Sequence, residues 1–192
     1  MKKITVYAAS SSKIEPYFFD AAKSLGKILA ENHITCVYGG GRLGLMGAMA
    51  DSILENKGKI IGIIPDFLNT IELGHTGLTY LHVVDSMHTR KTKLVEDTDA
   101  VIALPGGVGT LEELMEIITW KQLGFFTKPI VILNINGFYD PLLAMLDKII
   151  AERFLRPKHS EMWQVAKNPD EVLDLIDKAP KWDVEAIKFA QV

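Results

Sequence analysis

A glycine-rich segment followed directly by acidic residues is the part of this 192-residue chain best suited to bind a charged ligand. Residues 104–113 read LPGGVGTLEE, after an apolar run and before a helical pattern. Glycines let the backbone approach a ligand closely, and the free N–H groups at a helix start favour an anion such as phosphate. The segment predicts a phosphate-binding turn in a nucleotide-binding protein, with a purely structural tight turn as the alternative.

Two adjacent cations precede this turn, in the segment SMHTRKTKLV at residues 86–95. Met87 and Leu94 share one face of the predicted helix. Arg90 and Lys91 lie between them at helical spacing, so at least one of the two cations points along the apolar side. It extends over the core into solvent, or it binds an anion, for which arginine offers a planar fork of donors.

Three carboxylates accompany these motifs. Glu112 and Glu113 begin the helix after the glycine turn, and the spacing of Thr110 and Glu113 matches a capping box, which favours a structural role for Glu113. A carboxylate beside a bound phosphosugar can also stabilise a cationic sugar transition state or orient a water molecule. Glu72 lies in an irregular polar stretch and, by itself, is typical of a solvated loop residue.

A second glycine cluster, GGGRLG at residues 39–44, fits the dinucleotide-binding pattern G-x-G-x-x-G. The pattern is weak by itself, and little chain remains for the substrate domain of a hydride-transfer enzyme. The chain lacks the Walker lysine of a P-loop NTPase, since Thr110 is followed by Leu111, and this disfavours that class of protein. The five histidines show no metal-ligand spacing, so we expect no metal and no cofactor.

Composition narrows the remaining classes. Apolar residues make up 48% of the chain and charged residues 23%, which predicts a globular protein with a sizeable core. The formal net charge of −3 gives no sign of nucleic-acid binding, and no apolar run reaches the ~20 residues of a membrane span. A single cysteine, Cys36, and the lack of a secretory signal pattern favour a cytoplasmic protein.

Apolar runs of strand length alternate with segments of helical period along the chain. The runs are continuous, which indicates burial on both faces and hence a mostly parallel sheet flanked by helices. We expect one doubly wound α/β domain over residues 1–192, with the polar segment 66–79 as a long loop. Ligands bind beyond the carboxyl ends of strands in such sheets, which is where both glycine clusters lie. The predicted strands are 4–9, 34–38, 59–64, 80–84, 100–104, 129–133 and 162–166.

Several motifs together resemble the LOG ("lonely guy") family, the cytokinin riboside 5'-monophosphate phosphoribohydrolases. The family hallmark PGGxGTxxE is met by residues 105–113, and the associated M-x-x-R-K element by residues 87–91. The resemblance extends from about residue 3 to residue 155 and includes the upstream pattern YGGG…GLMG…AD at 38–41, 44–47 and 50–51. It implies a Rossmann-like fold, a homodimer and no metal.

The resemblance implies hydrolysis of the bond between an adenine-type base, N6-substituted or plain, and ribose 5'-monophosphate. Carried over by position, Arg90 and Glu113 form the catalytic pair. The implied substrate-binding residues are Glu72, Arg90, Lys91, Gly107, Val108, Gly109, Thr110, Leu111, Glu112, Glu113 and Thr119. A non-catalytic nucleotide-binding or carrier protein on the same scaffold is the alternative, because a binder needs the glycine turn but not both charged groups.

Two features qualify the resemblance. Family members often carry the label lysine decarboxylase, for which the sequence offers no cofactor-bearing lysine. The family's first turn usually reads close to C-G-S-S-x-G, whereas residues 8–13 read AASSSK and lack both glycines. This loss bears on the backbone geometry of the turn, and Lys13 offers a further cation for the cleft.

Overall fold

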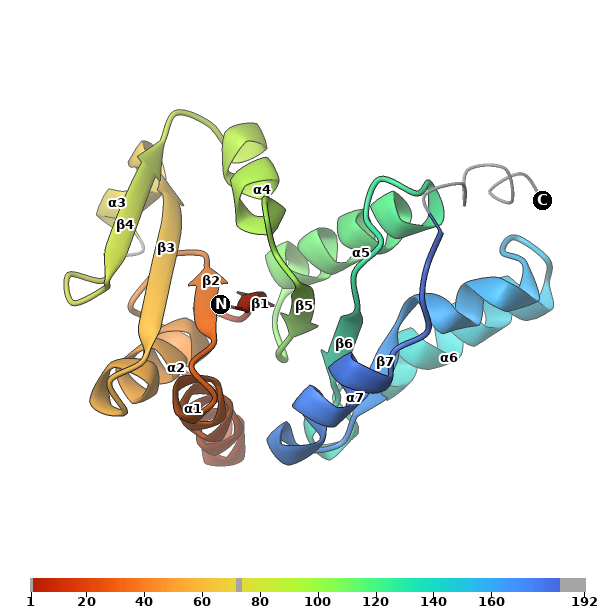
Figure 1. The fold of residues 1–192 in the computed structure, drawn as a ribbon, viewed down its shortest axis with the longest axis horizontal. Helices are drawn as coiled ribbons and strands as arrows, with labels where there is room; N and C mark the ends of the chain where they lie inside the picture. The colour runs from red at the N-terminus through yellow and green to blue at the C-terminus, as the bar shows by residue number, and fades with distance from the viewer. Residues whose placement is uncertain (1, 72–73, 184–192) are drawn as a thin grey trace.

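Seven parallel strands form one sheet at the centre of the computed structural model, which describes residues 2–71 and 74–183 (Figure 1). The strand order is β4-β3-β2-β1-β5-β6-β7, and each neighbouring pair is parallel. The predicted α/β class and parallel sheet are therefore confirmed. The strands are β1 (Lys3–Tyr7), β2 (Thr35–Tyr38), β3 (Lys59–Pro65), β4 (Tyr80–Val84), β5 (Ala100–Ala103), β6 (Ile130–Leu133) and β7 (Gln164–Ala166).

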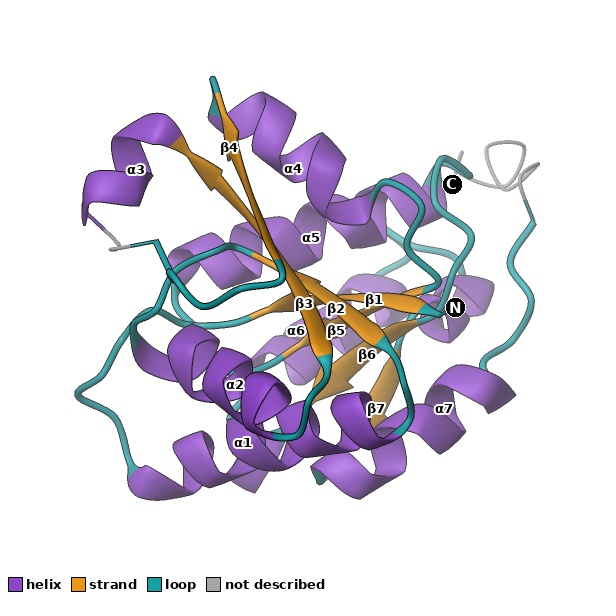
Figure 2. Cartoon of the chain, turned by 60° about the vertical axis from the view of Figure 1, so that its left-hand side comes forward, coloured by secondary structure: helices purple, strands orange, loops and turns teal. Residues whose placement is uncertain are grey.

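Helices cover both faces of the sheet (Figure 2). One face carries α1 (Pro16–Glu31), α2 (Gly44–Glu55) and α7 (Val172–Lys178). The other face carries α4 (Met87–Val95), α5 (Val108–Gln122) and α6 (Asp140–Ala151). Short 3-10 turns, η1 (Ile135–Gly137), η2 (Pro157–Met162) and η3 (Pro169–Glu171), join the later elements. Within the described ranges, no helix has the length and apolar composition needed to cross a membrane.

The central strands divide their side chains between two apolar cores. Every residue of β2, β5 and β6 is buried. Along β5, Ile102 packs into the core beneath α1 and α2, whereas Val101 and Ala103 pack into the core beneath α5 and α6. Burial on both faces is the physical reason why these strands are continuous apolar runs in the sequence.

The chain changes its direction of travel across the sheet between β4 and β5. Strands β1 to β4 are laid outward to one edge, and α4 then brings the chain back so that β5 pairs with the free side of β1 (Figure 1). The carboxyl ends of β1 and β5 therefore bound the switch point at which doubly wound proteins bind their ligands. The glycine turn at 106–109 follows β5 at this point.

The prediction of a loop over residues 66–79 is wrong in its first part, because Asp66–Ile71 forms the helix α3. Asp66 lies in its first turn, where the positive end of the helix dipole stabilises a carboxylate. A helix of six residues is too short to show a helical period, so the hydrophobic pattern could not indicate it. Glu72 lies outside the described residues.

Candidate active site

A cavity of about 300 Å³ opens at the carboxyl ends of β1, β2 and β5. Its walls are the segment after β1, Gly39 after β2, the glycine turn after β5, and Arg90 from α4. Of the residues predicted for the site, the cavity brings together Arg90, Gly107, Val108, Gly109, Thr110 and Glu113. The predicted catalytic pair and the predicted phosphate turn therefore face one space.

The glycine turn leaves room for a ligand at the start of α5. Gly107 is the N-cap of this helix, and as a glycine it offers no side-chain capping hydrogen bond to the first turn. A Cβ built at Gly107 or Gly109 meets no atom within 4 Å. The N–H groups in the first turn of a helix have no acceptor within the helix. The turn thus combines open space with hydrogen-bond donors, which suits a phosphate group.

The capping box predicted for Thr110 and Glu113 is wrong. Helix α5 begins at Val108, so Thr110 lies inside the first turn and not at the cap. The buried Thr110 side chain packs against Gly106, where a Cβ would lie less than 3.0 Å from it. Glu113 then lies one turn into the helix, half-buried in the cavity wall. Its position supports the functional interpretation of this carboxylate over the structural one.

Arg90 points into the fold and not along the surface of α4. Its side chain is 7% exposed and donates from Nε to the carbonyl of Ile63 and from Nη2 to the carbonyl of Gly39, both at 3.3 Å. Nη1 lies 3.8 Å from the sulfur of Met87. These partners are uncharged, and no carboxylate in the described part of the chain forms an ion pair with Arg90. The charge and the remaining N–H groups at the cavity are therefore suited to an anionic ligand.

The second glycine cluster shapes the wall of this cavity. A Cβ at Gly39 would lie less than 3.0 Å from Nη2 of Arg90, so only glycine leaves room for the guanidinium. Gly44 has a φ of +60°, and a Cβ built there would lie less than 3.0 Å from backbone atoms of Ser10 and Ser11. The match to a dinucleotide-binding pattern thus has an explanation in contacts within the fold.

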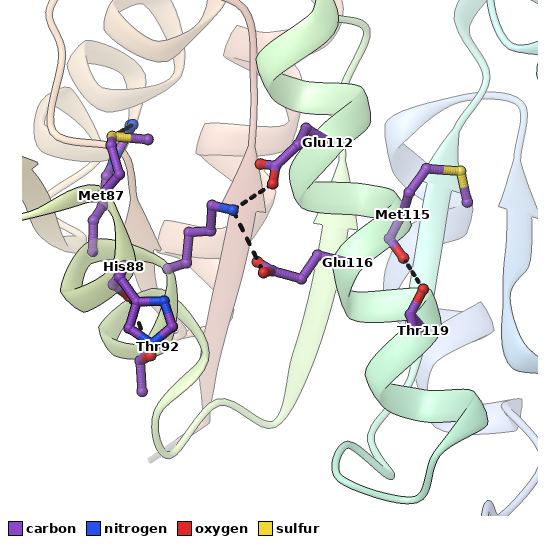
Figure 3. A network of polar contacts seen from close by, with 9 residues as sticks. Met87, His88, Thr92, Glu112, Met115, Glu116 and Thr119 are labelled. Carbon is purple, nitrogen blue, oxygen red and sulfur yellow. Dashed lines mark hydrogen bonds and ion pairs between the residues drawn. The ribbon is translucent and has the colours of Figure 1, made fainter.

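Lys91 points away from the cavity, toward α5. Its ammonium group pairs with Glu112 and lies 3.5 Å from Oε1 of Glu116. Figure 3 shows both carboxylates on the side of α5 that faces α4. The hydrogen bond that Lys91 donates to Glu112 is the main cause that raises the pKa of Lys91. Lys91 and Glu112, both predicted to bind substrate, are joined to each other in this structure and do not line the cavity.

The other predicted residues lie apart from this cavity. Thr119 is exposed further along α5, and its hydroxyl donates to the carbonyl of Met115 at 2.8 Å (Figure 3). Leu111 packs against the apolar core beneath α5. Lys13 is exposed and is not part of the cavity wall. The predicted site is thus only partly assembled by the described residues of one chain.

The cavity also includes Ser10 and Ser11 from the turn 8–13, Met46 from the motif 44–47, and Tyr7, which the sequence analysis did not single out. Tyr7 is the last residue of β1 and is almost fully buried. Burial and the nearby Glu113 carboxylate raise the pKa of Tyr7, so its phenol remains a protonated donor. The signal that could have found it is its position at the carboxyl end of the strand beside the switch point.

The described residues contain no cluster of three or more His, Cys, Asp or Glu side chains that could hold a metal ion. No lysine is among the described residues of the cavity wall. Lys121 is buried elsewhere, where its ammonium group donates to the carbonyl of Lys128 at 2.9 Å. These positions give no support to a lysine-bound cofactor at the site.

The fold defines a Rossmann-like protein, and its cavity lies at the switch point of the sheet. A family model described as "Possible lysine decarboxylase" matches residues 46–176. The chain is 40% identical over 183 residues to the cytokinin riboside 5'-monophosphate phosphoribohydrolase LOG2 of Arabidopsis thaliana, which covers 95% of this chain and 86% of that protein.

A second relative shows a similar identity. The cytokinin riboside 5'-monophosphate phosphoribohydrolase of Rhodococcoides fascians is 43% identical over 157 residues, which are 81% of this chain and 79% of that protein. The chain therefore belongs to the LOG family, as the motifs predict.

Solved structures share the fold at lower identity. The molybdenum cofactor carrier protein of Chlamydomonas reinhardtii matches with a TM-score of 0.71 and 18% identity, over 93% of this chain and 97% of that chain. The molybdenum cofactor binding protein of Rippkaea orientalis matches with a TM-score of 0.70 and 23% identity, over 92% and 96%. At these identities the likeness establishes the fold alone.

Proposed function

We propose that this protein hydrolyses the N-glycosidic bond of adenine-type nucleoside 5'-monophosphates, N6-substituted or plain, to free base and ribose 5-phosphate. The observation that carries the proposal is the meeting of a buried guanidinium, a carboxylate and an open glycine turn in one cavity, through Arg90, Glu113 and residues 107–109. Relatives named as cytokinin riboside 5'-monophosphate phosphoribohydrolases support the substrate class.

The glycine turn holds the 5'-phosphate in this proposal. The donors at the start of α5 bind the phosphate oxygens, and the space above Gly107 and Gly109 accommodates them. The phosphate takes no part in the bond cleavage. Its binding energy fixes the sugar relative to the reacting groups, which converts remote binding into orientation.

Glu113 and Arg90 act on the two sides of the breaking bond. Water forms a bond to C1' of the ribose as the bond from C1' to the base nitrogen breaks, and the proton released from the water is finally carried by the base. Glu113 stabilises the positive charge that develops at the sugar or holds the attacking water. A guanidinium is a poor proton donor, so Arg90 anchors the substrate or the departing base electrostatically.

We also propose a homodimer in which α5 contributes to the contact. Val108 and Thr119 are exposed on this helix, and the Val108 side chain is 83% exposed although it is apolar. Thr119 does not line the cavity of its own chain, so a role in substrate binding requires a second copy. Sedimentation equilibrium tests the dimer directly, and a protein that stays monomeric at micromolar concentration contradicts it.

The catalytic assignment is tested with Glu113→Ala and the control Glu152→Ala, which removes an exposed carboxylate after α6. Each protein is incubated with AMP and N6-substituted AMP, and the free base is measured by chromatography. We expect Glu113→Ala to stay folded and to lower kcat by about 100-fold or more. Wild-type turnover in this variant overturns the assignment. Binding of AMP without base release by the wild-type protein favours a carrier.

A further inference from the structure

Glu116 is not among the predicted site residues, yet it takes part in the ion-pair cluster that joins α4 to α5. The ammonium group of Lys91 contacts Glu112 and Glu116 on neighbouring turns of α5 (Figure 3). The side chains of Lys91 and Glu116 are 21% and 31% exposed, so solvent screens this pair less than a fully exposed one. The cluster therefore ties the two helices together beside the cavity.

Helix α4 is held on its other side by the preceding residue. Successive side chains on a helix point about 100° apart, so Arg90 and Lys91 reach different neighbours. Arg90 donates to the carbonyl of Gly39, which follows β2, and to the carbonyl of Ile63, which lies in β3. Lys91 reaches α5, which carries Glu113. The placement of Arg90 relative to Glu113 thus depends on contacts that α4 makes in both directions.

We propose that Glu116 is a positioning residue for the reaction. Together with Glu112 it holds Lys91, and this fixes the positions of Arg90 and Glu113 relative to each other across the cavity. The inference rests on the proposed function, in which these two residues form the catalytic pair. Lys91 then serves as the link between two helices, and the phosphate is bound by the glycine turn. This assigns Lys91 a different role from direct substrate binding.

The two roles for Lys91 predict different kinetics. If Lys91 binds substrate directly, Lys91→Met raises KM and its effect is independent of Glu116. If Lys91 links the helices, Lys91→Met and Glu116→Gln both lower kcat with little change in KM. A displacement of catalytic groups by about 1 Å can reduce a rate by about 100-fold, so loosening the link has a measurable effect.

The experiment compares wild type, Glu116→Gln, Lys91→Met and the double variant. The matched control is Asp174→Asn, which removes the carboxylate of an exposed pair with Lys178 inside the single helix α7. For each protein, kcat and KM for AMP, the Kd for AMP by calorimetry, and thermal unfolding are measured. We expect each single variant to lower kcat by about tenfold or more with an unchanged Kd. The double variant then resembles Lys91→Met, because Lys91→Met already removes both contacts of Lys91 with α5 and the loss of Glu116 adds nothing further.

Three results contradict the proposal or its basis. Wild-type kcat in Glu116→Gln, with an active wild-type protein, overturns the positioning role alone. A raised KM and Kd in Lys91→Met without any effect of Glu116→Gln assigns Lys91 to the substrate and also overturns it. If the wild-type protein binds AMP but releases no base, the proposed function fails and the positioning role falls with it.

Discussion

The guanidinium of Arg90 occupies the space that a side chain on Gly39 needs. A Cβ at Gly39 would lie less than 3.0 Å from Nη2 of Arg90, and the carbonyl of Gly39 accepts a hydrogen bond from the same nitrogen at 3.3 Å. Gly39 thus leaves room for the buried guanidinium and also holds it by a hydrogen bond. The side chain cannot move far without losing contacts, because it is 93% removed from solvent, with only 7% exposed.

Gly39→Ala is therefore expected to displace Arg90 from the cavity wall. The displacement lowers kcat by about tenfold or more, since the cation no longer faces the substrate. Overpacking at this buried site also destabilises the fold by about 1–3 kcal/mol. Steady-state kinetics and urea unfolding measure the two effects. Full activity in a protein of wild-type stability shows that the guanidinium position is unimportant.

Gly107→Ala is expected to weaken the binding of AMP without lowering the stability of the fold. Its φ of −85° is accessible to alanine, and a Cβ there meets no atom within 4 Å, so the fold tolerates the change. The added methyl group fills space that the phosphate occupies in our proposal. We expect KM for AMP to rise by about tenfold, which corresponds to about 1.4 kcal/mol. An unchanged KM places the phosphate elsewhere.

Tyr139→Phe tests whether a buried hydrogen bond stabilises the backbone just before the glycine turn. The buried Tyr139 hydroxyl donates to the carbonyl of Leu104 at 2.7 Å, just before the turn. Removing the donor leaves that buried carbonyl short of one hydrogen bond, at a cost of about 1–2 kcal/mol in unfolding free energy. Tyr17→Phe, at a residue that is 39% exposed, is the control with little expected effect. Equal urea midpoints for both variants refute this role.

Lys121 is expected to make the stability of the protein depend on pH. Its side chain is 1% exposed, and Trp182 lies over it with an indole N–H that donates to the Lys121 carbonyl at 2.6 Å. Burial lowers the pKa of Lys121 to about 8, whereas unfolded lysine has a pKa of about 10.4. Between these values the unfolded chain binds the extra proton, so stability rises with pH, by up to about 3 kcal/mol. Below pH 8 the amine is protonated in both states and adds no slope.

Urea unfolding at several pH values between 7 and 11 measures this rise. Lys121→Met removes the titrating group, and the variant is expected to lose the increase in stability between about pH 8 and pH 10.4. Lys128→Met serves as the control, because it keeps the carbonyl that Lys121 contacts and removes a different amine. The same rise in Lys121→Met as in wild type assigns the effect to other groups.

The strands were predictable from the sequence because strands that are buried on both faces consist of continuous apolar residues. The run IVIL of β6 is buried at every position, and such a run has no polar face to disguise its period. The glycine turn was predictable for a similar reason, since glycines between a strand and a helix have few structural alternatives. Its place at the carboxyl end of β5 follows from the parallel arrangement.

The directions of the charged side chains were not predictable from local spacing. Helical period placed Arg90 and Lys91 near the apolar face but could not distinguish them, because the choice depends on Gly39 and Glu116, which are distant in sequence. The capping box failed because Gly107 begins the helix earlier than Thr110. In both cases a tertiary contact or an earlier helix start decided what the local pattern left open.

The most direct test of the account compares AMP with adenosine as substrates of the wild-type protein. Free adenine and ribose 5-phosphate are measured by chromatography, and kcat/KM is determined for both compounds. Because the glycine turn binds the 5'-phosphate, we expect adenine release from AMP, with adenosine disfavoured by about 100-fold or more in kcat/KM. Binding of AMP without release of adenine, or equal cleavage of adenosine, contradicts a phosphoribohydrolase with this site.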